Sequence, residues 1–419
     1  MTHLRTPLFI ALIALTPFLA ETAAAQAALD LNAEGAQLYE AGKWERAVKK
    51  FFHAYQADPQ NDTIRTNLSN AYQAYAGHLA ETGKYDGAID QLQDAIRYDP
   101  TNPRPLVQLG AYFIHEGHVA DAIFRLEEAI ELAPDDIDAH YLLGEAYYKD
   151  NDAAAALEHW EWAIAQDPEI PGLAERIENV SREERVEADF AGRNSRHFSV
   201  SYDREAAGAL VREVLEHLEQ AYREVGRVFG RAYPPSPIQV SLYTVEGFTE
   251  STQLDEHVGA VYDGTKIRCP VIDAAGTRLP SDELRRRLYH EYVHVVVHHL
   301  AKENVPWWLN EGLAEVLSSD LSEAEFDLLR RARKQDALFH LRDLMHSQLD
   351  SQEVGALRVA YTQSHATVGF LKKRFGTRNF SNLLGALADG EDPERALRKW
   401  FRHNYRTLEL AVANYIEEG

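Results

Sequence analysis

The sequence predicts a multidomain protein in which an all-α solenoid of repeats is followed by an α+β domain. Three observations support this fold class. Prolines recur at an interval of 34 residues, at Pro100, Pro134 and Pro168. The pattern changes at residues 197–202, where apolar and polar side chains alternate with period two, as is typical of a strand. Farther along, residues 290–294 read His-Glu-Tyr-Val-His, a spacing that puts both imidazoles on one face of a helix.

The start of the chain predicts a secretory signal over residues 1–25. It has a basic residue, Arg5, then an apolar run at 8–20, and small residues at 23–25 that provide a cleavage site. The apolar run is shorter than the roughly 20 residues that a membrane helix needs. An uncleaved anchor is the alternative. We expect an exported protein, periplasmic or secreted, with no stable membrane span after cleavage.

Composition limits the partners and the sources of stability. A net charge of −23 argues against nucleic acid or an anionic membrane as the main partner. Cys269 is the only cysteine among 419 residues, so no internal disulfide is expected. No candidate base lies near it in sequence, which argues against a thiolate nucleophile. The length suits two or three domains that are stabilised by their cores.

Small residues recur at fixed offsets before each of the prolines, where paired helices would touch. They are Gly35, Ala47, Ala54, Ala76, Ala88, Ala95, Gly110, Ala122, Ala129, Gly144, Ala156 and Ala163. The interval from Pro59 to Pro100 is 41 residues, which predicts about two extra helical turns near 62–69. We therefore expect four units over about 28–170 and a capping helix at about 171–188.

This 34-residue pattern resembles tetratricopeptide repeats. The resemblance implies a solenoid over residues 28–190 whose concave face binds a peptide or protein partner. Tyr72, Tyr141 and Tyr148 are candidates to line that face. The alternative is that these aromatic rings fill the grooves between helices.

The second domain is predicted at residues 196–419. Strands are expected at 197–202 and 237–243, and one or two more at 259–273, with a long helix at 205–229 between the first two. The second half reads as mainly helical. Its predicted signals are an N-cap at Ser281, a capping box from Ser322 to Glu325, a helix at 357–375 ended by Gly376, and two or three short helices after it.

Residues 290–294 provide two metal ligands and a base. His290 and His294 can hold one zinc ion, and the carboxylate of Glu291 lies beside them, able to take a proton from a water that the metal polarises. His298 stands roughly 12 Å along the helix axis from His290, too far to share the ion. Glu311 is the better third ligand, because a break at 304–306 lets a second helix fold back.

Residues 308–315, Trp-Leu-Asn-Glu-Gly-Leu-Ala-Glu, resemble an element of the gluzincins, the thermolysin-like and aminopeptidase-like zinc peptidases. The resemblance implies a thermolysin-like peptidase domain in which His290, His294 and Glu311 ligate zinc and Glu291 is the catalytic base. It also implies that Glu315 orients a ligating histidine. The spacing of sixteen residues between His294 and Glu311 is shorter than in the most familiar members. No Gly-x-Met-Glu-Asn element of the aminopeptidases occurs, so an endopeptidase is favoured.

Two further features of the peptidase are predicted. Residues 361–365, Tyr-Thr-Gln-Ser-His, resemble a segment common after the metal site of small peptidase domains. It implies an oxyanion donor, with Tyr361 as first choice and His365 as second, and ordinary core packing as the alternative. The segment 259–262 is the candidate edge strand for an extended substrate.

Two other classes of function remain open. One is a non-catalytic envelope scaffold or adaptor, whose peptidase-like domain binds without cutting. The other is a structural zinc site, whose metal holds the fold together. The presence of both the ligands and Glu291 favours the enzyme over the scaffold.

Overall fold

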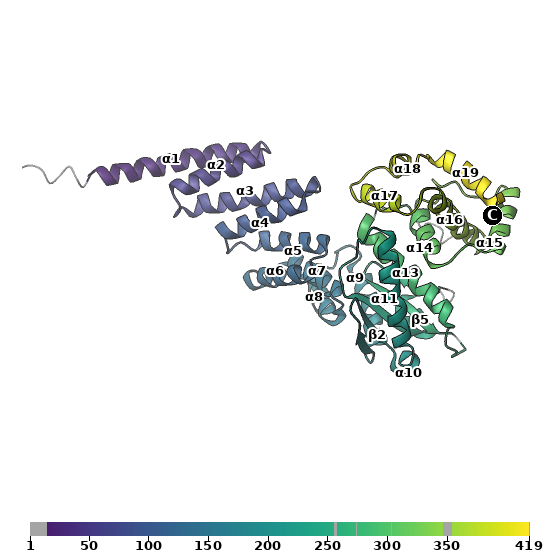
Figure 1. Ribbon diagram of the computed structural model, residues 1–419. Coiled ribbons are helices and arrows are strands. Elements are labelled where there is room, and N and C mark those ends of the chain that lie inside the picture. Colours follow the sequence, from purple (N-terminus) through teal and green to yellow (C-terminus); the bar gives the residue numbers. More distant parts are fainter. Residues whose placement is uncertain (1–14, 255–257, 274, 303, 347–353, 419) are drawn as a thin grey trace, which may run out of the picture. The chain divides into compact units, whose positions relative to one another are not determined.

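The computed structural model describes residues 15–254, 258–273, 275–302, 304–346 and 354–418 (Figure 1). The chain divides into two compact units, with the division between Glu178 and Asn179. The division falls within one helix, α9 (Leu173–Glu187).

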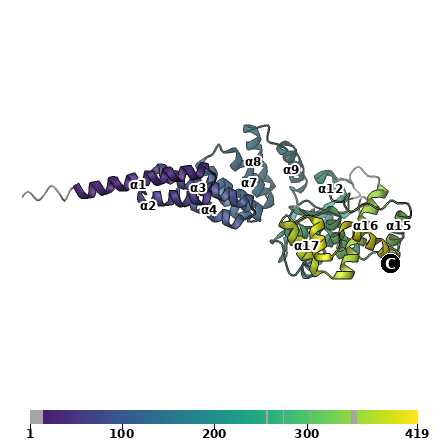
Figure 2. The ribbon, with the colours of Figure 1, turned by 90° about the horizontal axis from the view of Figure 1, so that it is seen from above.

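The first unit consists of helices that pack in sequence order. Their bounds are α1 (Leu15–Glu40), α2 (Trp44–Ala57), α3 (Asp62–Glu81), α4 (Tyr85–Tyr98), α5 (Arg104–Glu116), α6 (Val119–Leu132), α7 (Ile137–Lys149) and α8 (Ala153–Gln166). Each helix contacts the next, and α1·α2, α3·α4, α5·α6 and α7·α8 form hairpins (Figures 1 and 2). The prediction of an all-α solenoid is confirmed.

The twelve small residues predicted at helix contacts are all buried. Within the hairpins a large side chain, sixteen positions later, occupies the space that a glycine leaves. Phe51 packs on Gly35, Leu126 on Gly110 and Trp160 on Gly144, where an added Cβ would lie 2.4 Å from the indole ring. The repeat of small residues therefore reflects close helix contact, with the bulky partner supplied by the second helix of each hairpin.

The extra turns predicted near residues 62–69 are present at the start of α3. This helix has 20 residues, whereas α5 and α7, which hold the same place in the next two repeats, have 13 each. The difference of seven residues is about two helical turns.

Two of the three tyrosines proposed for a binding face make ring contacts within the repeats. Tyr72 is buried and its ring stacks on that of Tyr98, with centroids 5.7 Å apart. Tyr148 lies 5.7 Å from the ring of Trp160, and the Arg176 guanidinium lies over it. Of these three, Tyr141 has no ring contact with another described residue, and its backbone carbonyl accepts a hydrogen bond from the Trp160 indole.

Residues 1–14 of the predicted signal lie outside the described residues. From Leu15 onward the chain belongs to α1, and Ala28 is packed against Ala54 and Ile64. Within the described part of the chain, none of the helices combines the length and the apolar character needed to span a bilayer.

In the second unit, the described residues form a five-stranded mixed sheet in the order β1-β2-β3-β5-β4. The strands are β1 (Ala191–Asn194), β2 (Phe198–Tyr202), β3 (Ile238–Thr244), β4 (Val261–Tyr262) and β5 (Lys266–Ile272). β2, β3 and β5 are parallel, and the edge strands β1 and β4 are antiparallel to their neighbours. β1 was not predicted, because its four residues, three of them exposed, have no apolar alternation.

Helices make up the rest of this unit. They are α10 (Arg204–Ala207), α11 (Val211–Val228), α12 (Val245–Thr252), α13 (Ser281–Ala301), α14 (Trp307–Ser318), α15 (Glu323–Lys334), α16 (Val354–Phe375), α17 (Arg378–Ala388), α18 (Pro393–Phe401) and α19 (Tyr405–Glu418). One core joins them to the sheet, with α13 between the sheet on one side and α14 and α17 on the other.

Most predicted helix signals are present, and two predictions were wrong in detail. The capping box of Ser322 and Glu325 begins α15, and Gly376, with φ of +74°, ends α16. The helix predicted at 205–229 is interrupted at 208–210 and forms α10 and α11. Ser281 is not the N-cap of α13: the helix begins at Ser281, after Pro280, and the hydroxyl oxygen of Ser281 lies 3.3 Å from Nε2 of His217.

Candidate metal centre

The site is formed by two helices that follow each other in the chain. α13 ends at Ala301, and α14 begins at Trp307, after the break that the sequence predicts around Pro306. The backbone N–H groups of Trp307 and Trp308, which lack partners within the helix, donate to the carbonyls of Met345 and Leu344. The start of α14 is thus fixed, and its next turn faces α13.

Three side chains from these helices converge. Nε2 of His290 and Nε2 of His294 lie 3.5 and 3.6 Å from the same carboxylate oxygen of Glu311. One candidate ligand atom from each residue lies within 4.8 Å of the others, and no other group of three such residues was found in the described chain. Two imidazoles and one carboxylate are the donor set of catalytic zinc sites. The residues present therefore fit this metal.

The second nitrogen of each imidazole also has a neighbour. Nδ1 of His294 lies 3.0 Å from Oδ1 of Asn310, within hydrogen-bond distance. Nδ1 of His290 lies 3.5 Å from the carboxylate of Glu315, the residue predicted to orient a ligating histidine. An imidazole whose Nδ1–H faces an oxygen presents its Nε2 lone pair to a metal.

Burial and the neighbouring charges shift the pKa values of His290 and Glu311 in opposite directions. Burial alone would lower the pKa of His290, but the neighbouring carboxylates, Glu311 foremost, outweigh it and raise the pKa to about 9. Burial would raise the pKa of Glu311, yet His294 and His290 outweigh it and lower the pKa. For Glu291, burial dominates and raises the pKa.

The three residues line a cavity of about 550 Å³. Glu291 lines it too, and the backbone N–H of Tyr262 on the edge strand β4 donates to its carboxylate. Because this amide faces the cavity, the predicted segment 259–262 does border the site, although only Val261 and Tyr262 form the strand.

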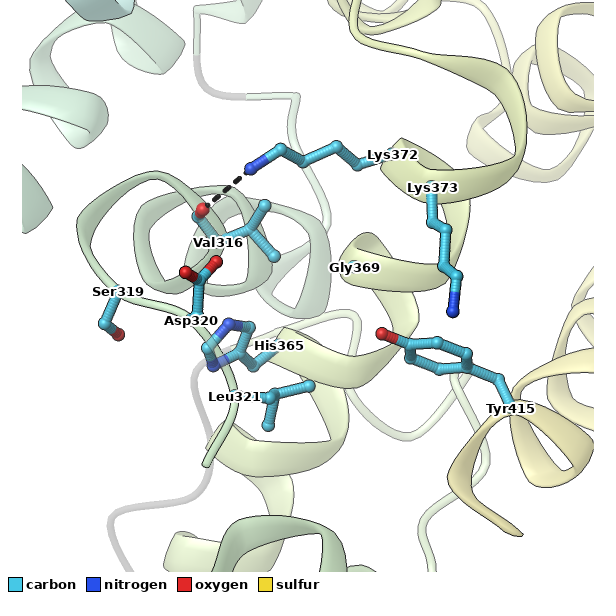
Figure 3. Close-up of a pocket in the computed structure, with 9 residues that line it drawn as sticks. All are labelled: Val316, Ser319, Asp320, Leu321, His365, Gly369, Lys372, Lys373 and Tyr415. Atoms are coloured by element: carbon cyan, nitrogen blue, oxygen red, sulfur yellow. Dashed lines mark hydrogen bonds between the residues drawn. The ribbon is translucent and has the colours of Figure 1, made fainter. Parts of the chain in front are cut away.

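The two candidate oxyanion donors are separated. Tyr361 lines the cavity, and its ring lies 4.9 Å from that of Trp307 in a T-shaped contact. His365 does not line it; its ring borders a different pocket, which shares no lining residue with this cavity (Figure 3). The second choice of donor is therefore not supported by its position.

A close helix contact explains this separation. Gly312 of α14 lies against the backbone of α16, where an added Cβ would be 2.5 Å from the carbonyl oxygen of Ser364. Ser364 lies between Tyr361 and His365 in the sequence. α14 therefore crosses α16 at this point, with the tyrosine on the side of the metal centre and the histidine beyond it.

Sequence reasoning missed several residues of the site. Asn310 occupies the variable position of the Trp-Leu-x-Glu element, so the motif carries no signal for it. Lys302, which ends α13 with φ of +55°, lines the cavity together with Asp263. His298, judged too far along the helix to share the ion, also lies at the cavity, with its ring 5.9 Å from that of Tyr262.

Comparisons with solved structures give partial matches to repeat proteins. One is the first TPR domain of Spaghetti bound to an HSP90 peptide, with 19% identity, 27% of this chain and 90% of that chain covered, and a TM-score of 0.27. Another is residues 41 to the end of MamA from Desulfovibrio magneticus RS-1, with 21% identity, 37% and 84% covered, and a TM-score of 0.31. None of the curated proteins matches the sequence.

Family models match both units of the chain. A TPR repeat model matches residues 79–114 and 112–151. The Peptidase MA superfamily model matches residues 240–418, which include strands β4 and β5, most of β3, all three converging residues and Tyr361. The chain therefore carries tetratricopeptide repeats at residues 79–151, followed by a domain of the Peptidase MA superfamily at residues 240–418.

Proposed function

We propose that this protein is a zinc-dependent peptidase whose metal is held by His290, His294 and Glu311. The observation that carries the proposal is the convergence of these three side chains, with Glu291, in one cavity bordered by a strand edge. A structural zinc site is usually closed by four protein ligands, whereas three protein ligands leave one position open for chemistry.

Glu291 and Tyr361 have different roles in the proposed reaction. Zinc, when bound, supplies a Lewis acid that polarises a carbonyl oxygen and lowers the pKa of water. Glu291 accepts the proton of the attacking water and passes it to the leaving amine. The Tyr361 hydroxyl donates a hydrogen bond to the carbonyl oxygen as negative charge develops on it. Trp307, in contact with the Tyr361 ring, holds this side chain in the cavity.

The position of β4 favours cleavage within a chain. β4 is an edge strand and its residues line the cavity, so an extended peptide can add to this edge through backbone hydrogen bonds. Such binding needs no free terminus. We therefore propose an endopeptidase.

The repeats would bring a peptide or protein partner to this enzyme, because solenoids of this kind present extended concave binding surfaces. We also propose that the protein is exported, periplasmic or secreted, on the basis of the basic and apolar pattern of residues 1–25. Determining the N-terminus of the protein recovered from its producing cells tests the export proposal. A retained Met1 in all of the protein would argue against cleavage.

Zinc content and casein cleavage, measured for the wild type and for Glu291→Gln, test the enzymatic proposal. We expect equimolar zinc in both and cleavage by the wild type alone, since Glu291 is not needed as a ligand. Cleavage at equal rates by both proteins would overturn the mechanism. Stoichiometric zinc without cleavage of any protein substrate would favour the scaffold or adaptor.

A structural zinc site makes a different prediction. If zinc held the fold together, chelation would unfold the domain. For the enzyme we expect chelation to abolish cleavage while the far-ultraviolet circular dichroism spectrum is retained, and added zinc to restore activity.

A further inference from the structure

A second polar pocket lies at the C-terminal end of α14, and none of its lining residues borders the metal cavity. This α14–α16 pocket has a volume of about 200 Å³ and is bordered by Asp320, His365, Gly369, Lys372, Lys373 and Tyr415 (Figure 3). These residues come from the loop after α14 and from α16 and α19. They share no side chain with the metal cavity, so the proposed peptidase mechanism gives the pocket no role.

His365 is one of the residues that border the pocket. Its side chain is only 3% exposed, and its ring borders the pocket beside Asp320 (Figure 3). Among the described residues, no hydrogen bond satisfies either ring nitrogen. Burial lowers the pKa of His365, so the neutral imidazole offers one donor and one acceptor. A ligand in the pocket would hydrogen-bond these nitrogens in place of water.

Gly369, which also borders the pocket, lies within α16. A Cβ added there would be 3.8 Å from both the Tyr415 hydroxyl oxygen and Val316 Cγ2, which is ordinary van der Waals contact. Helix packing therefore does not require glycine at this position, in contrast to Gly312. Glycine in a helix interior is less favourable than alanine. What the glycine provides is open space between Val316 and Tyr415 (Figure 3).

The charges around this space are of both signs. Lys372 donates to the carbonyl oxygen of Val316 at 3.2 Å, which uses one of its three protons. Lys373 lies over the Tyr415 ring, 5.1 Å from its centroid, and Asp320 is exposed at the pocket mouth. A ligand with only a negative charge would be repelled by the Asp320 carboxylate, and a ligand with only a positive charge would be repelled by the two ammonium groups.

We propose that the α14–α16 pocket binds a free amino acid as its zwitterion. The ligand carboxylate pairs with Lys372 and its ammonium group with Asp320, which lie on the same side of the pocket, whereas Lys373 lies on the other side, over the Tyr415 ring (Figure 3). The His365 imidazole, beside Asp320, donates or accepts a further hydrogen bond to the ligand. The open space at Gly369 receives a small or medium side chain, and large aromatic side chains exceed the volume.

Calorimetric titration of the zinc-loaded full chain with alanine tests this proposal, with acetate and methylamine as probes of each charge alone. We expect saturable binding of alanine at one site, and binding of acetate and of methylamine about tenfold weaker or more, since each lacks one charge-assisted contact. Absence of alanine binding at concentrations up to about 10 mM would overturn the proposal.

Variants then locate the bound amino acid. Lys372→Met and Asp320→Asn should each weaken alanine binding about tenfold, and Gly369→Leu should abolish it. Arg374→Met, an exposed cation on the same helix that does not border the pocket, serves as the matched control and should bind as the wild type does.

One further variant separates a loss of amino-acid binding from a loss of folding. Gly369→Ala favours the helix and meets its neighbours without a clash, so it should remain folded and weaken the binding of leucine more than that of glycine. If Lys372→Met, Asp320→Asn and Gly369→Leu all bound alanine as tightly as the wild type, the amino acid would be held elsewhere, the metal centre included, and the proposal would be wrong.

Discussion

The side-chain oxygen of Asn310 lies 3.0 Å from Nδ1 of His294, while Nε2 of the same ring lies 3.6 Å from Glu311. Asn310 and Glu311 are adjacent in α14, so this helix supplies both a candidate ligand and the oxygen that orients a second ligand on α13. An Nδ1–H that donates to Asn310 fixes the imidazole in the tautomer that can bind a metal through Nε2.

Replacing Asn310 tests this relationship. We expect Asn310→Ala to lower zinc affinity by about 10- to 100-fold, because the His294 ring would lose the acceptor that fixes its orientation. Asn310→Asp, which keeps an acceptor oxygen, should bind zinc nearly as the wild type does. Competition with a chromophoric chelator measures the affinities. Asn414→Ala, at an exposed position of α19, is the control, and an equal loss there would contradict a specific role.

Glu315 makes the corresponding contact to His290, at 3.5 Å from Nδ1. Glu315→Ala should lower zinc affinity by about tenfold or more, and Glu315→Gln by less, because the amide keeps an acceptor but loses the charge. The same chelator competition measures both. Finding that neither change alters the affinity would show that the carboxylate serves only to stabilise the helix. Glu418→Gln, on an exposed site, provides the comparison.

The sequence predicts well those parts of the site that depend on helix geometry. His290 and His294 are four residues apart on a helix, and their rings lie 4.8 Å apart. Glu311 could be placed because the break around Pro306 forces a new helix, and a chain of that length can fold back. The buried small residues of the repeats follow from the same kind of regular contact.

Contacts between helices distant in sequence could not be predicted in this way. Tyr361 and His365 are one helical turn apart, and their spacing puts them on nearly the same face of α16. They nevertheless border different cavities, because the Gly312 backbone packs on Ser364 between them. β1 was missed for another reason: its pairing with β2 is made by the backbone, while its side chains are mostly exposed.

The Gly312 contact leads to a stability prediction. In Gly312→Ala the new methyl group would lie 2.5 Å from both the Ser364 carbonyl oxygen and Val368 Cγ2. Because the oxygen belongs to the backbone, α14 and α16 must move apart, and we expect a loss of about 1–3 kcal/mol in the free energy of unfolding. Urea unfolding followed by circular dichroism measures the change.

Gly385→Ala is the matched control for this substitution. Gly385 also lies within a helix, α17, but a Cβ there would have no neighbour within 4 Å. Alanine should therefore stabilise the domain by up to about 1 kcal/mol through helix propensity alone. If both substitutions shifted the urea midpoint in the same direction, close packing at Gly312 would not be the cause.

A buried cluster of charges beneath the sheet predicts how stability depends on pH. Glu183 of α9 pairs with Lys266 and with Arg268 of β5, and all three side chains are at most 6% exposed. Burial alone would raise the pKa of Glu183, but Arg268 and Lys266 outweigh it and lower the pKa. An acid whose pKa is lower in the folded state than in the unfolded state binds its proton more readily after unfolding. Its contribution to stability is therefore complete above the unfolded pKa, about 4.3, and is lost as pH falls through the folded pKa.

We expect the free energy of unfolding of the wild type to fall as pH decreases below about 4.3, and to fall less steeply in Glu183→Gln. At neutral pH the substitution should destabilise the domain by about 3–5 kcal/mol, because Lys266 and Arg268 stay buried with one partner fewer. Lys266 retains Glu187 at 3.1 Å, which places the expected loss toward the lower end. Urea unfolding of both proteins at several pH values measures the two effects separately. Parallel curves for the two proteins below neutral pH would show that Glu183 does not release its proton on folding, and that its pairing with the two cations is not what stabilises the sheet.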